Sequence, residues 1–317
     1  LREYYTMKLF DLHCDTLSRC LDTKEPLFQN SGQLDGARIC GTNAPWVQTF
    51  ACFIESGCRG EAAFQRFLSM QRLFCKTLES DPVHFASYMP ENEPKPAQCT
   101  AVLSVEGGTA IGGNIRNIAV MADLGVRFFT LVWNGDNELA HGTGGEEKGL
   151  TPFGKDCLKE LLRVGIVPDI SHLNDFGIDD VFSQTDAPVI ATHSNLRAVC
   201  EHLRNLTDAQ FKELVRRRGL CGLNFYPLFV TGEKHDSYAY DALRRHLDRM
   251  LSLGGEQIVA LGSDFDGAPM PLCLSSAERL VTLYEAVVKW YGEPLADRLF
   301  YGNAADFMKK HGGLAAV

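Results

Sequence analysis

The sequence has no uninterrupted apolar stretch near the roughly 20 residues that a membrane-spanning helix requires. It also lacks the apolar core of a secretory signal peptide ahead of Asp11. Positive charge is in deficit, because 31 lysines and arginines face 40 aspartates and glutamates, which gives a net charge of −9. These absences argue against a membrane span and against a basic surface for nucleic acid or anionic lipid.

Paired cysteine motifs are absent as well. The eleven cysteines are odd in number, and none forms a Cys-x-x-Cys pair. Several, such as Cys52 and Cys221, lie inside apolar stretches and fit small buried side chains. We therefore expect reduced thiols in a cytoplasmic protein that binds neither nucleic acid nor membrane, and the composition leaves a homodimer open.

A repeated pattern predicts the fold: a helix-like segment ends at a glycine, and an apolar strand follows at once. We expect the left-handed conformation that closes a helix at Gly125, Gly165, Gly219 and Gly254. Four further apolar segments complete a series of eight strands. They are predicted at residues 8–15, 47–54, 101–106, 126–131, 167–170, 189–191, 220–224 and 258–261.

The alternation indicates an α/β protein with a single (β/α)8 barrel of the TIM type, and an open, doubly wound sheet is the alternative. Residues 22–46 show no clear period and are predicted to be loop, whereas residues 277–310 should form closing helices. No linker divides the 317 residues. We predict one catalytic domain over residues 7–317 and interpret residues 1–6, which precede Met7, as a leader or added segment.

Side chains that bind divalent metals fall at the predicted carboxyl ends of the strands. They are His13, Asp15, Glu106, His172, His193 and Asp264. Strand carboxyl ends meet at one mouth of a barrel, where ligands bind. Three imidazoles and three carboxylates suit two divalent cations, because both groups bind Zn²⁺ and one carboxylate can bridge two metals. Glu106, between the two groups of ligands in the chain, is the expected bridge.

Each of these residues also has a structural interpretation. Asp15 could cap a helix, and Asp264 or Asp266 could brace the turn after the last strand. Glu106 could simply face solvent. Such interpretations must apply six separate times, always at a strand end, whereas a metal centre explains the set once. The other histidines are interpreted as structural, except that His141, in a glycine-rich loop, stays undecided.

Seven short motifs resemble those of one known family. They are Asp11-Leu-His-Cys-Asp-Thr, Ser104-Val-Glu-Gly, Gly149-Leu-Thr-Pro-Phe-Gly, Asp169-Ile-Ser-His, Ala191-Thr-His-Ser, Asn224-Phe-Tyr and Gly262-Ser-Asp-Phe-Asp-Gly. Together they resemble the membrane (renal) dipeptidase family of zinc metallopeptidases, within the amidohydrolase superfamily. The resemblance implies two zinc ions per chain, with His13 and Asp15 at one, His172 and His193 at the other, and Glu106 bridging them.

The resemblance also implies roles beside the metal ligands. Asp264 corresponds to the family's catalytic aspartate, which carries a proton. Arg204 corresponds to the position that grips the free carboxylate of the substrate, and a guanidinium suits such a two-point contact. Tyr226 is assigned to substrate binding as well.

One position departs from the family's pattern. Mammalian relatives carry a histidine at the end of the fourth strand, which steadies the developing oxyanion, and this chain has Trp133 there. An indole N–H donates a hydrogen bond but carries no charge. Trp133, Asn134 or His141 could replace the histidine, or the metal could act alone. Trp133 and Asn134 are accordingly assigned to the substrate site.

The sequence thus predicts a zinc-dependent dipeptidase, with a metal-bridging hydroxide as nucleophile and Asp264 as proton shuttle. Because family members often accept a D-residue at the C-terminal position, small L-Xaa-D-Xaa peptides are expected substrates. One alternative is another amide hydrolase, acting on N-acyl-amino acids or cyclic amides. The other is a metal-loaded binding protein without catalysis, which would have no need of Asp264.

Overall fold

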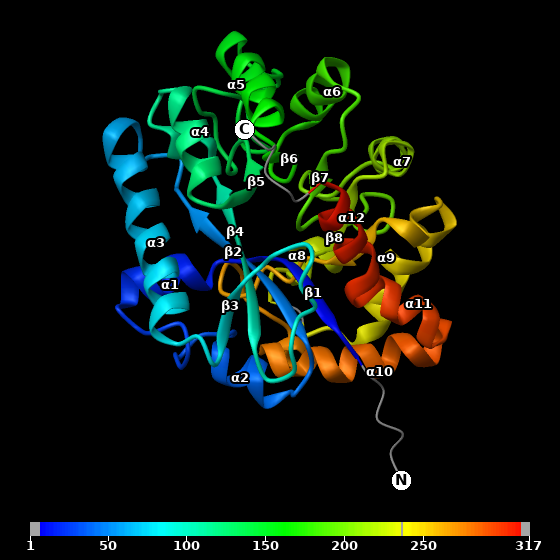
Figure 1. Ribbon diagram of the computed structural model, residues 1–317. Coiled ribbons are helices and arrows are strands. Elements are labelled where there is room, and N and C mark those ends of the chain that lie inside the picture. Colours follow the sequence, from blue (N-terminus) through cyan, green and yellow to red (C-terminus); the bar gives the residue numbers. More distant parts are fainter. Residues whose placement is uncertain (1–6, 236, 312–317) are drawn as a thin grey trace.

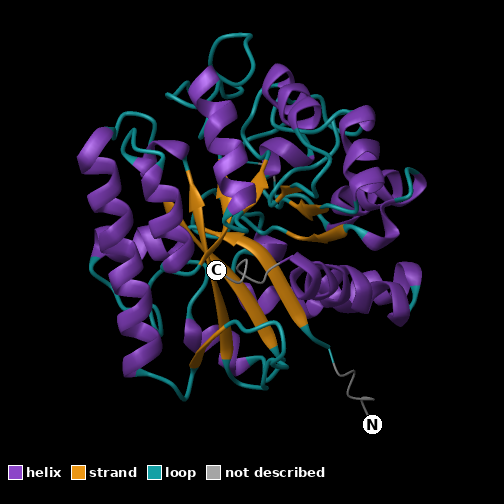
Figure 2. Ribbon diagram, turned by 45° about the horizontal axis from the view of Figure 1, so that its top comes forward, coloured by secondary structure: helices purple, strands orange, loops and turns teal. Residues whose placement is uncertain are grey.

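The computed structural model describes residues 7–235 and 237–311, and a parallel barrel lies at its centre (Figures 1 and 2). Residues 1–6, interpreted from the sequence as a leader or added segment, lie outside the described residues. Within the described part of the chain, eight strands form the barrel. They are β1 (Leu9–Cys14), β2 (Trp46–Phe53), β4 (Cys99–Glu106), β5 (Val126–Thr130), β6 (Val167–Asp169), β7 (Ile190–Ala191), β8 (Leu220–Leu223) and β9 (Val259–Leu261).

Parallel pairing continues around the whole ring of strands. β1 pairs with β2 on one side and with β9 on the other, and β2 pairs with β4 over its full length. The remaining neighbours pair in sequence order from β4 to β9. This closure confirms the predicted (β/α)8 barrel and shows that the open, doubly wound alternative was wrong.

Helices surround the barrel and are shown in Figure 2 as an outer layer around the strands. They are α1 (Thr16–Thr23), α2 (Gly36–Gly41), α3 (Gly60–Ser80), α4 (Arg116–Asp123), α5 (Pro152–Arg163), α6 (Asp175–Gln184), α7 (Asp208–Arg217), α8 (Pro227–Val230), α9 (Tyr240–Ser252), α10 (Leu280–Tyr291), α11 (Glu293–Asp297) and α12 (Asn303–His311). The π-helical turn Arg298–Gly302 joins α11 to α12. Short 3-10 turns lie at Gly108–Ile111, Gly255–Gln257, Leu272–Leu274 and Ala277–Arg279. None of the helices described is both long and apolar enough to cross a bilayer.

Every barrel strand contributes to an apolar interior. The contributing residues are Phe10, Leu12, Val47, Val102, Phe128, Val167, Ile190, Leu220 and Ala260. Four residues of α12 join the same cluster, and the Asn303 side chain donates a hydrogen bond to the Val259 carbonyl at 2.8 Å, at the start of β9. Helix α12 therefore closes the amino end of the barrel, so the site forms at the carboxyl end.

The predicted helix-closing glycines are confirmed at three of four positions. Positive φ angles of 92°, 80° and 89° occur at Gly125, Gly165 and Gly254. The prediction for Gly219 was wrong, because Arg218 takes the left-handed conformation, with φ of 55°. Gly219 is required by a close contact instead, since a Cβ there would lie 2.1 Å from the Val189 carbonyl oxygen.

Two of the short elements that were not predicted lie before the carboxyl half of β4. Residues 22–46, expected to be loop, contain α2, whose N-cap Asp35 accepts a hydrogen bond from the backbone N–H of Arg38 at 2.7 Å. β3 (Phe85–Ser87) pairs with the amino half of β4, below the residues that pair with β5. Both elements are too short to show a periodic pattern.

Candidate metal centre

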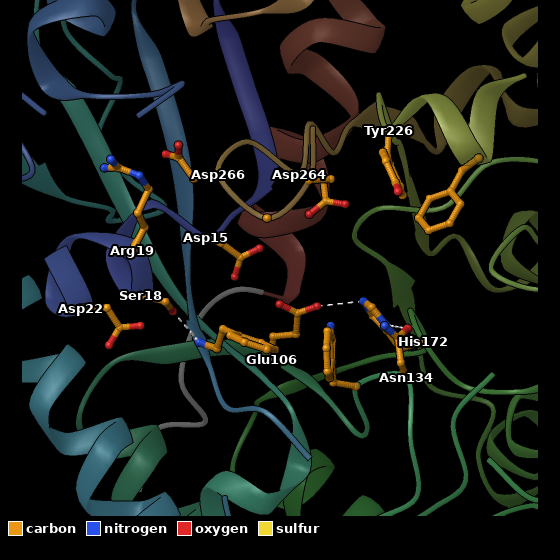
Figure 3. A pocket seen from close by; sticks show the side chains of 15 residues that line it. Asp15, Ser18, Arg19, Asp22, Glu106, Asn134, His172, Tyr226, Asp264 and Asp266 are labelled. Carbon is orange, nitrogen blue, oxygen red and sulfur yellow. Dashed lines mark hydrogen bonds and ion pairs between the residues drawn. The ribbon is translucent and has the colours of Figure 1, made fainter. Parts of the chain in front are cut away.

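All six predicted site residues converge at the carboxyl mouth of the barrel, and all are buried. They lie in or directly after five strands: His13 and Asp15 at β1, Glu106 at β4, His172 at β6, His193 at β7 and Asp264 at β9. Figure 3 shows Asp15, Glu106, His172 and Asp264 pointing into one pocket.

Glu106 lies between the histidines. Its Oε2 is 3.4 Å from Nε2 of His13, and its Oε1 is 2.8 Å from Nε2 of His172 and 3.6 Å from Nε2 of His193. Asp15 Oδ2 is 3.4 Å from Nε2 of His13. The two carboxylate oxygens of Glu106 thus face the two groups of residues that the family resemblance assigns to separate metals.

Ligand atoms group closely enough to hold a metal in two overlapping sets. Those of His13, Glu106 and His193 lie within 4.8 Å of one another, and so do those of His13, Asp15 and Asp264. The predicted proton carrier Asp264 therefore lies as near to His13 and Asp15 as a further ligand would.

Local backbone geometry brings these side chains together. The register of β1 shifts between Asp11 and Cys14, so strand alternation alone does not place His13 beside Asp15. Asp15 occupies the N-cap position of α1, but its side chain makes no capping hydrogen bond. Capping therefore does not account for Asp15. His172 and Asp264 have left-handed backbones, with φ of 70° and 65°, a strained conformation that concentrates at functional sites.

Three polar side chains hold the cluster from outside. Asn134 Oδ1 lies 2.8 Å from Nδ1 of His172, and Thr192 Oγ1 lies 2.8 Å from Nδ1 of His193. The Asn224 side chain donates to Oδ2 of Asp264 at 3.0 Å. Sequence reasoning missed Thr192 and Asn224. Both residues lie in motifs of the family resemblance and follow predicted strands, but nothing in the sequence indicated which side chains they contact.

Buried negative charge dominates the electrostatics of the cluster. Burial and the neighbouring Asp15 raise the pKa of Glu106 to about 8, and burial raises the pKa of Asp264 to about 6. Burial alone would lower the pKa of His13, but the charges of Glu106 and Asp15 outweigh it and raise that pKa. Each carboxylate would gain from a cation placed among them.

The donor atoms fit divalent metal ions. With both Nδ1 atoms hydrogen-bonded, Nε2 of His172 and Nε2 of His193 face each other at 2.9 Å, beside Oε1 of Glu106. Nε2 of His13 and Oδ1 of Asp15 are buried without a hydrogen-bond partner among the described residues. Imidazole nitrogens and carboxylate oxygens turned toward one space are the donor set of a zinc-type site.

A cavity of about 300 Å³ opens beside this cluster. Aromatic rings line it, namely Phe53, Trp133, Tyr226 and Phe229, together with Asn134. Trp133 packs edge-to-face on Phe53, with 5.0 Å between ring centroids, and its ring is 6.4 Å from that of His172. The volume is at the low end for small-molecule sites, which suits a compact substrate.

Arg204 is buried near the same histidines. Its Nη2 donates to the His193 carbonyl at 3.4 Å, and its guanidinium lies over the Phe229 ring, 5.3 Å from the centroid. Its Nε is buried without a hydrogen-bond partner, and no carboxylate of the described residues forms an ion pair with it. Asp264, Glu106 and Asp169 act on its charge only from a distance, so this buried cation can receive a carboxylate from outside the chain.

The other described histidines lie outside the cluster. His141, undecided from the sequence, has Nδ1 3.0 Å from Oδ1 of Asp136. His246 is buried and hydrogen-bonded to the backbone of Leu196 and Val230. Neither lines the cavity beside the metal centre.

Comparison with known proteins identifies relatives along the whole barrel. An uncharacterised dipeptidase of Schizosaccharomyces pombe is 31% identical over 244 residues, which is 70% of this chain and 58% of that protein. A metallopeptidase from Rhodobacter sphaeroides, bound to a phosphinate mimic of the dipeptide L-Ala-D-Ala, superposes with a TM-score of 0.89 at 27% identity, over 97% of this chain and 100% of that one. Dipeptidase AC, of peptidase family M19, gives a TM-score of 0.89 at 29% identity, over 98% and 100%.

A closed parallel barrel with histidines and carboxylates at its carboxyl mouth defines a metal-dependent hydrolase. Within that class, the chain belongs to the membrane dipeptidase family, peptidase family M19, whose model matches residues 4–314. It is a metallo-dipeptidase, a hydrolase of peptide bonds, as the sequence motifs predicted.

Proposed function

We propose that this chain is a zinc-dependent dipeptidase for dipeptides with a free C-terminal carboxylate, L-Xaa-D-Xaa dipeptides among them. His13 and Asp15 would hold one zinc ion, His172 and His193 the other, and Glu106 both. When bound, two such ions lower the pKa of a shared water toward neutrality and polarise the scissile carbonyl.

The observation that carries this proposal is the pairing of the cluster with Arg204. A carboxylate bound at the guanidinium would give its buried Nε the hydrogen-bond acceptor that it lacks. Since Arg204 also touches the His193 carbonyl, that carboxylate would lie close to the cluster. A short distance from carboxylate to scissile bond restricts the substrate to a dipeptide.

Asp264 is suited to move the proton. Burial raises its pKa to about 6, so its carboxylate can take a proton from the attacking water and return it to the leaving amine near neutral pH. The Asn224 side chain orients it by donating to Oδ2. Glu106, Asp264 and the metal ligands would thus form the catalytic set.

The aromatic lining would hold the substrate's side chains. Tyr226 and Trp133 line the cavity, and both rings can pack on a residue of either chirality. Asn134 lines it too, but only its amide N–H₂ group is left for a substrate, because its Oδ1 faces His172. The phosphinate mimic of L-Ala-D-Ala bound by the Rhodobacter sphaeroides relative supports a D-residue at the C-terminal position.

The test combines metal analysis with one substitution. The purified full chain should contain two zinc ions, and Asp264→Asn should keep both while its kcat falls by roughly 10²–10⁴-fold on L-Ala-D-Ala. Absence of bound metal, or full activity of D264N, would refute the proposal. A substrate panel decides against the alternative amide hydrolase if N-acyl-amino acids and cyclic amides are poorer substrates than dipeptides.

A further inference from the structure

His172 and His193, the two histidines of one proposed metal site, each contact a polar side chain that is not itself a ligand. In both rings the contact is made by Nδ1, the nitrogen turned away from the proposed metal. Nδ1 of His172 is 2.8 Å from Oδ1 of Asn134, and Nδ1 of His193 is 2.8 Å from Oγ1 of Thr192. We infer that Asn134 and Thr192 are positioning residues, which fix the proton of each ring on Nδ1 and leave both Nε2 atoms free for the cations. This inference rests on the proposed two-zinc site.

The direction of the Thr192 hydrogen bonds can be deduced from Asp169. Thr192 Oγ1 is 2.6 Å from Asp169 Oδ2, and the same carboxylate accepts hydrogen bonds from the Thr130 hydroxyl at 2.6 Å and from the backbone N–H groups of Ser171 and Thr192. With four donors around it, Asp169 receives the single hydroxyl proton of Thr192. The oxygen of Thr192 is then an acceptor toward His193, so Nδ1 of His193 carries the proton.

Asn134 is held in place by the loop after β5. Its backbone carbonyl accepts a hydrogen bond from Gly144 at 2.7 Å, and a Cβ at Gly142 would lie 2.5 Å from the same oxygen. The same loop is also hydrogen-bonded to His172, because the Thr143 N–H donates to the His172 carbonyl at 3.0 Å. An amide oxygen can only accept, so Nδ1 of His172 carries the proton.

As a consequence, Nε2 of His172 and Nε2 of His193 both present a lone pair to the proposed cations. With protons on both Nδ1 atoms, the two Nε2 lone pairs face each other at 2.9 Å, and Oε1 of Glu106 is 2.8 Å from one of them. If Thr192 or Asn134 lost its oxygen, the ring could move its proton to Nε2, where it competes with the cation. Partners of this kind typically change metal affinity by about 10–100-fold.

Metal retention measures this effect directly. The full-length variants Thr192→Val and Asn134→Leu keep side-chain size but lose the acceptor oxygen, whereas Thr192→Ser and Asn134→Asp keep it. Each is dialysed against graded chelator concentrations with Zn²⁺ as the probe. We expect T192V and N134L to bind Zn²⁺ roughly 10–100-fold more weakly than the unchanged chain, and T192S and N134D to stay close to it.

Thr49 offers a matched control. It is fully buried in β2, and its hydroxyl has no hydrogen-bond partner among the described residues. Thr49→Val should therefore hold Zn²⁺ within twofold of the unchanged chain. If T192V and N134L also stay within twofold, or if T49V weakens binding as much as T192V, the inference is wrong.

A spectroscopic reading keeps the inference testable even if a variant does not fold. In the unchanged chain with ¹⁵N-labelled histidine, the His172 and His193 rings, assigned by substituting each in turn, should show protonated Nδ1 before and after metal is added. A proton on Nε2 of either ring in the metal-free chain would overturn the inference. If the unchanged chain binds no Zn²⁺, the proposed function itself fails; if it binds Zn²⁺ and T192V binds equally well, only this inference fails.

Discussion

A buried guanidinium without a carboxylate partner costs stability unless something outside the chain neutralises it. Arg204 has that environment, so Arg204→Met should leave the melting temperature unchanged or raise it. The same change removes a charge-assisted contact to the substrate carboxylate. We expect kcat/KM for a dipeptide to fall roughly 10–150-fold and selectivity over the C-terminal amide to disappear.

Arg217 provides the matched control for Arg204. It is equally buried, but it pairs with Glu213 at 2.7 Å and donates to the Phe182 carbonyl at 2.7 Å. Arg217→Met should lower the free energy of unfolding by about 3 kcal/mol, because it leaves the Glu213 carboxylate and the Phe182 carbonyl without their donor. KM should stay unchanged, because these groups lie far from the cavity beside the metal centre. Thermal melts of both variants measure the change in stability, and dipeptide kinetics measure the change in substrate binding. A destabilised R204M with normal selectivity would show that Arg204 is structural.

The turn after β9 passes so close to the metal centre that a Cβ at Gly267 would overlap two of its carboxylates. A Cβ at Gly267 would lie 2.1 Å from Oδ2 of Asp15 and 2.4 Å from Oδ1 of Asp264. Gly267→Ala must therefore displace both carboxylates, and a displacement near 1 Å costs roughly 10²-fold in turnover. At Gly41 a Cβ has no neighbour within 4 Å, so Gly41→Ala is the control. Equal kcat values for the two variants would contradict the geometry.

At the scale of elements, His246 fastens α9 to the end of α8 and to the loop after β7. Its Nδ1 accepts from the Leu196 N–H at 3.3 Å, and its Nε2–H donates to the Val230 carbonyl at 3.1 Å. Burial lowers the pKa of His246 to about 4, below the value of about 6.5 expected in the unfolded chain. The unfolded chain therefore binds the extra proton, and the stabilising contribution is lost as the pH falls from about 6.5 toward 4.

Between pH 7.5 and pH 5, this single histidine should remove about 2 kcal/mol of stability. His246→Gln should be less stable at pH 7.5, because two hydrogen bonds are disturbed, but its stability should fall less steeply. Urea unfolding of both proteins at the two pH values isolates the effect, since all other groups are shared. Parallel losses in the two proteins would mean that His246 is not the titrating group.

The strands were predictable because their apolar residues and helix-closing signals are local in the sequence. The segments just beyond the strands were less predictable. Asp15 lies next to His13 through a register shift in β1 and the start of α1, which strand alternation does not describe. Gly219 was predicted to be left-handed, but that conformation belongs to Arg218, and Gly219 is required by its close contact with the Val189 carbonyl just before β7.

The site shows the same contrast between features that are local in the sequence and contacts between distant segments. Its six metal-binding and catalytic candidates could be predicted together because each ends a strand, and strand ends meet in a barrel. The residues that hold them could not. Thr192, directly after β7, contacts its neighbour His193 and also Asp169 at the end of β6. Asn224, directly after β8, contacts Asp264, which follows β9. Such contacts depend on side-chain directions that leave no periodic trace in the sequence.

At the scale of the whole molecule, the centre exists only when the ring is closed. His13 lies on the first strand of the barrel and Asp264 comes after the last, and the Asp264 N–H donates to the His13 carbonyl at 3.2 Å. The Ser263 hydroxyl donates to Asp11 Oδ2 at 2.6 Å across the same junction. Cations bound there would hold together strands that are far apart in the sequence, so metal binding should stabilise the entire fold.

Chelation should therefore lower the melting temperature of the whole protein. Zinc at about a thousand times its dissociation constant stabilises the folded state by about 4 kcal/mol, which corresponds to a rise of roughly 5–10 °C in melting temperature for a protein of this size.

The Glu106→Gln substitution should abolish that rise in melting temperature. In the metal-free state its effect should reverse, because burial and Asp15 raise the pKa of Glu106 to about 8, so the ionised carboxylate destabilises the fold increasingly as the pH rises from about 4.5 through 8. At pH 8.5 metal-free E106Q should melt above the metal-free unchanged chain and below the zinc-loaded one. Calorimetric scans of both proteins with and without chelator test this order, and a metal-free E106Q that melts lowest of all would mean that Glu106 stabilises the barrel without a cation.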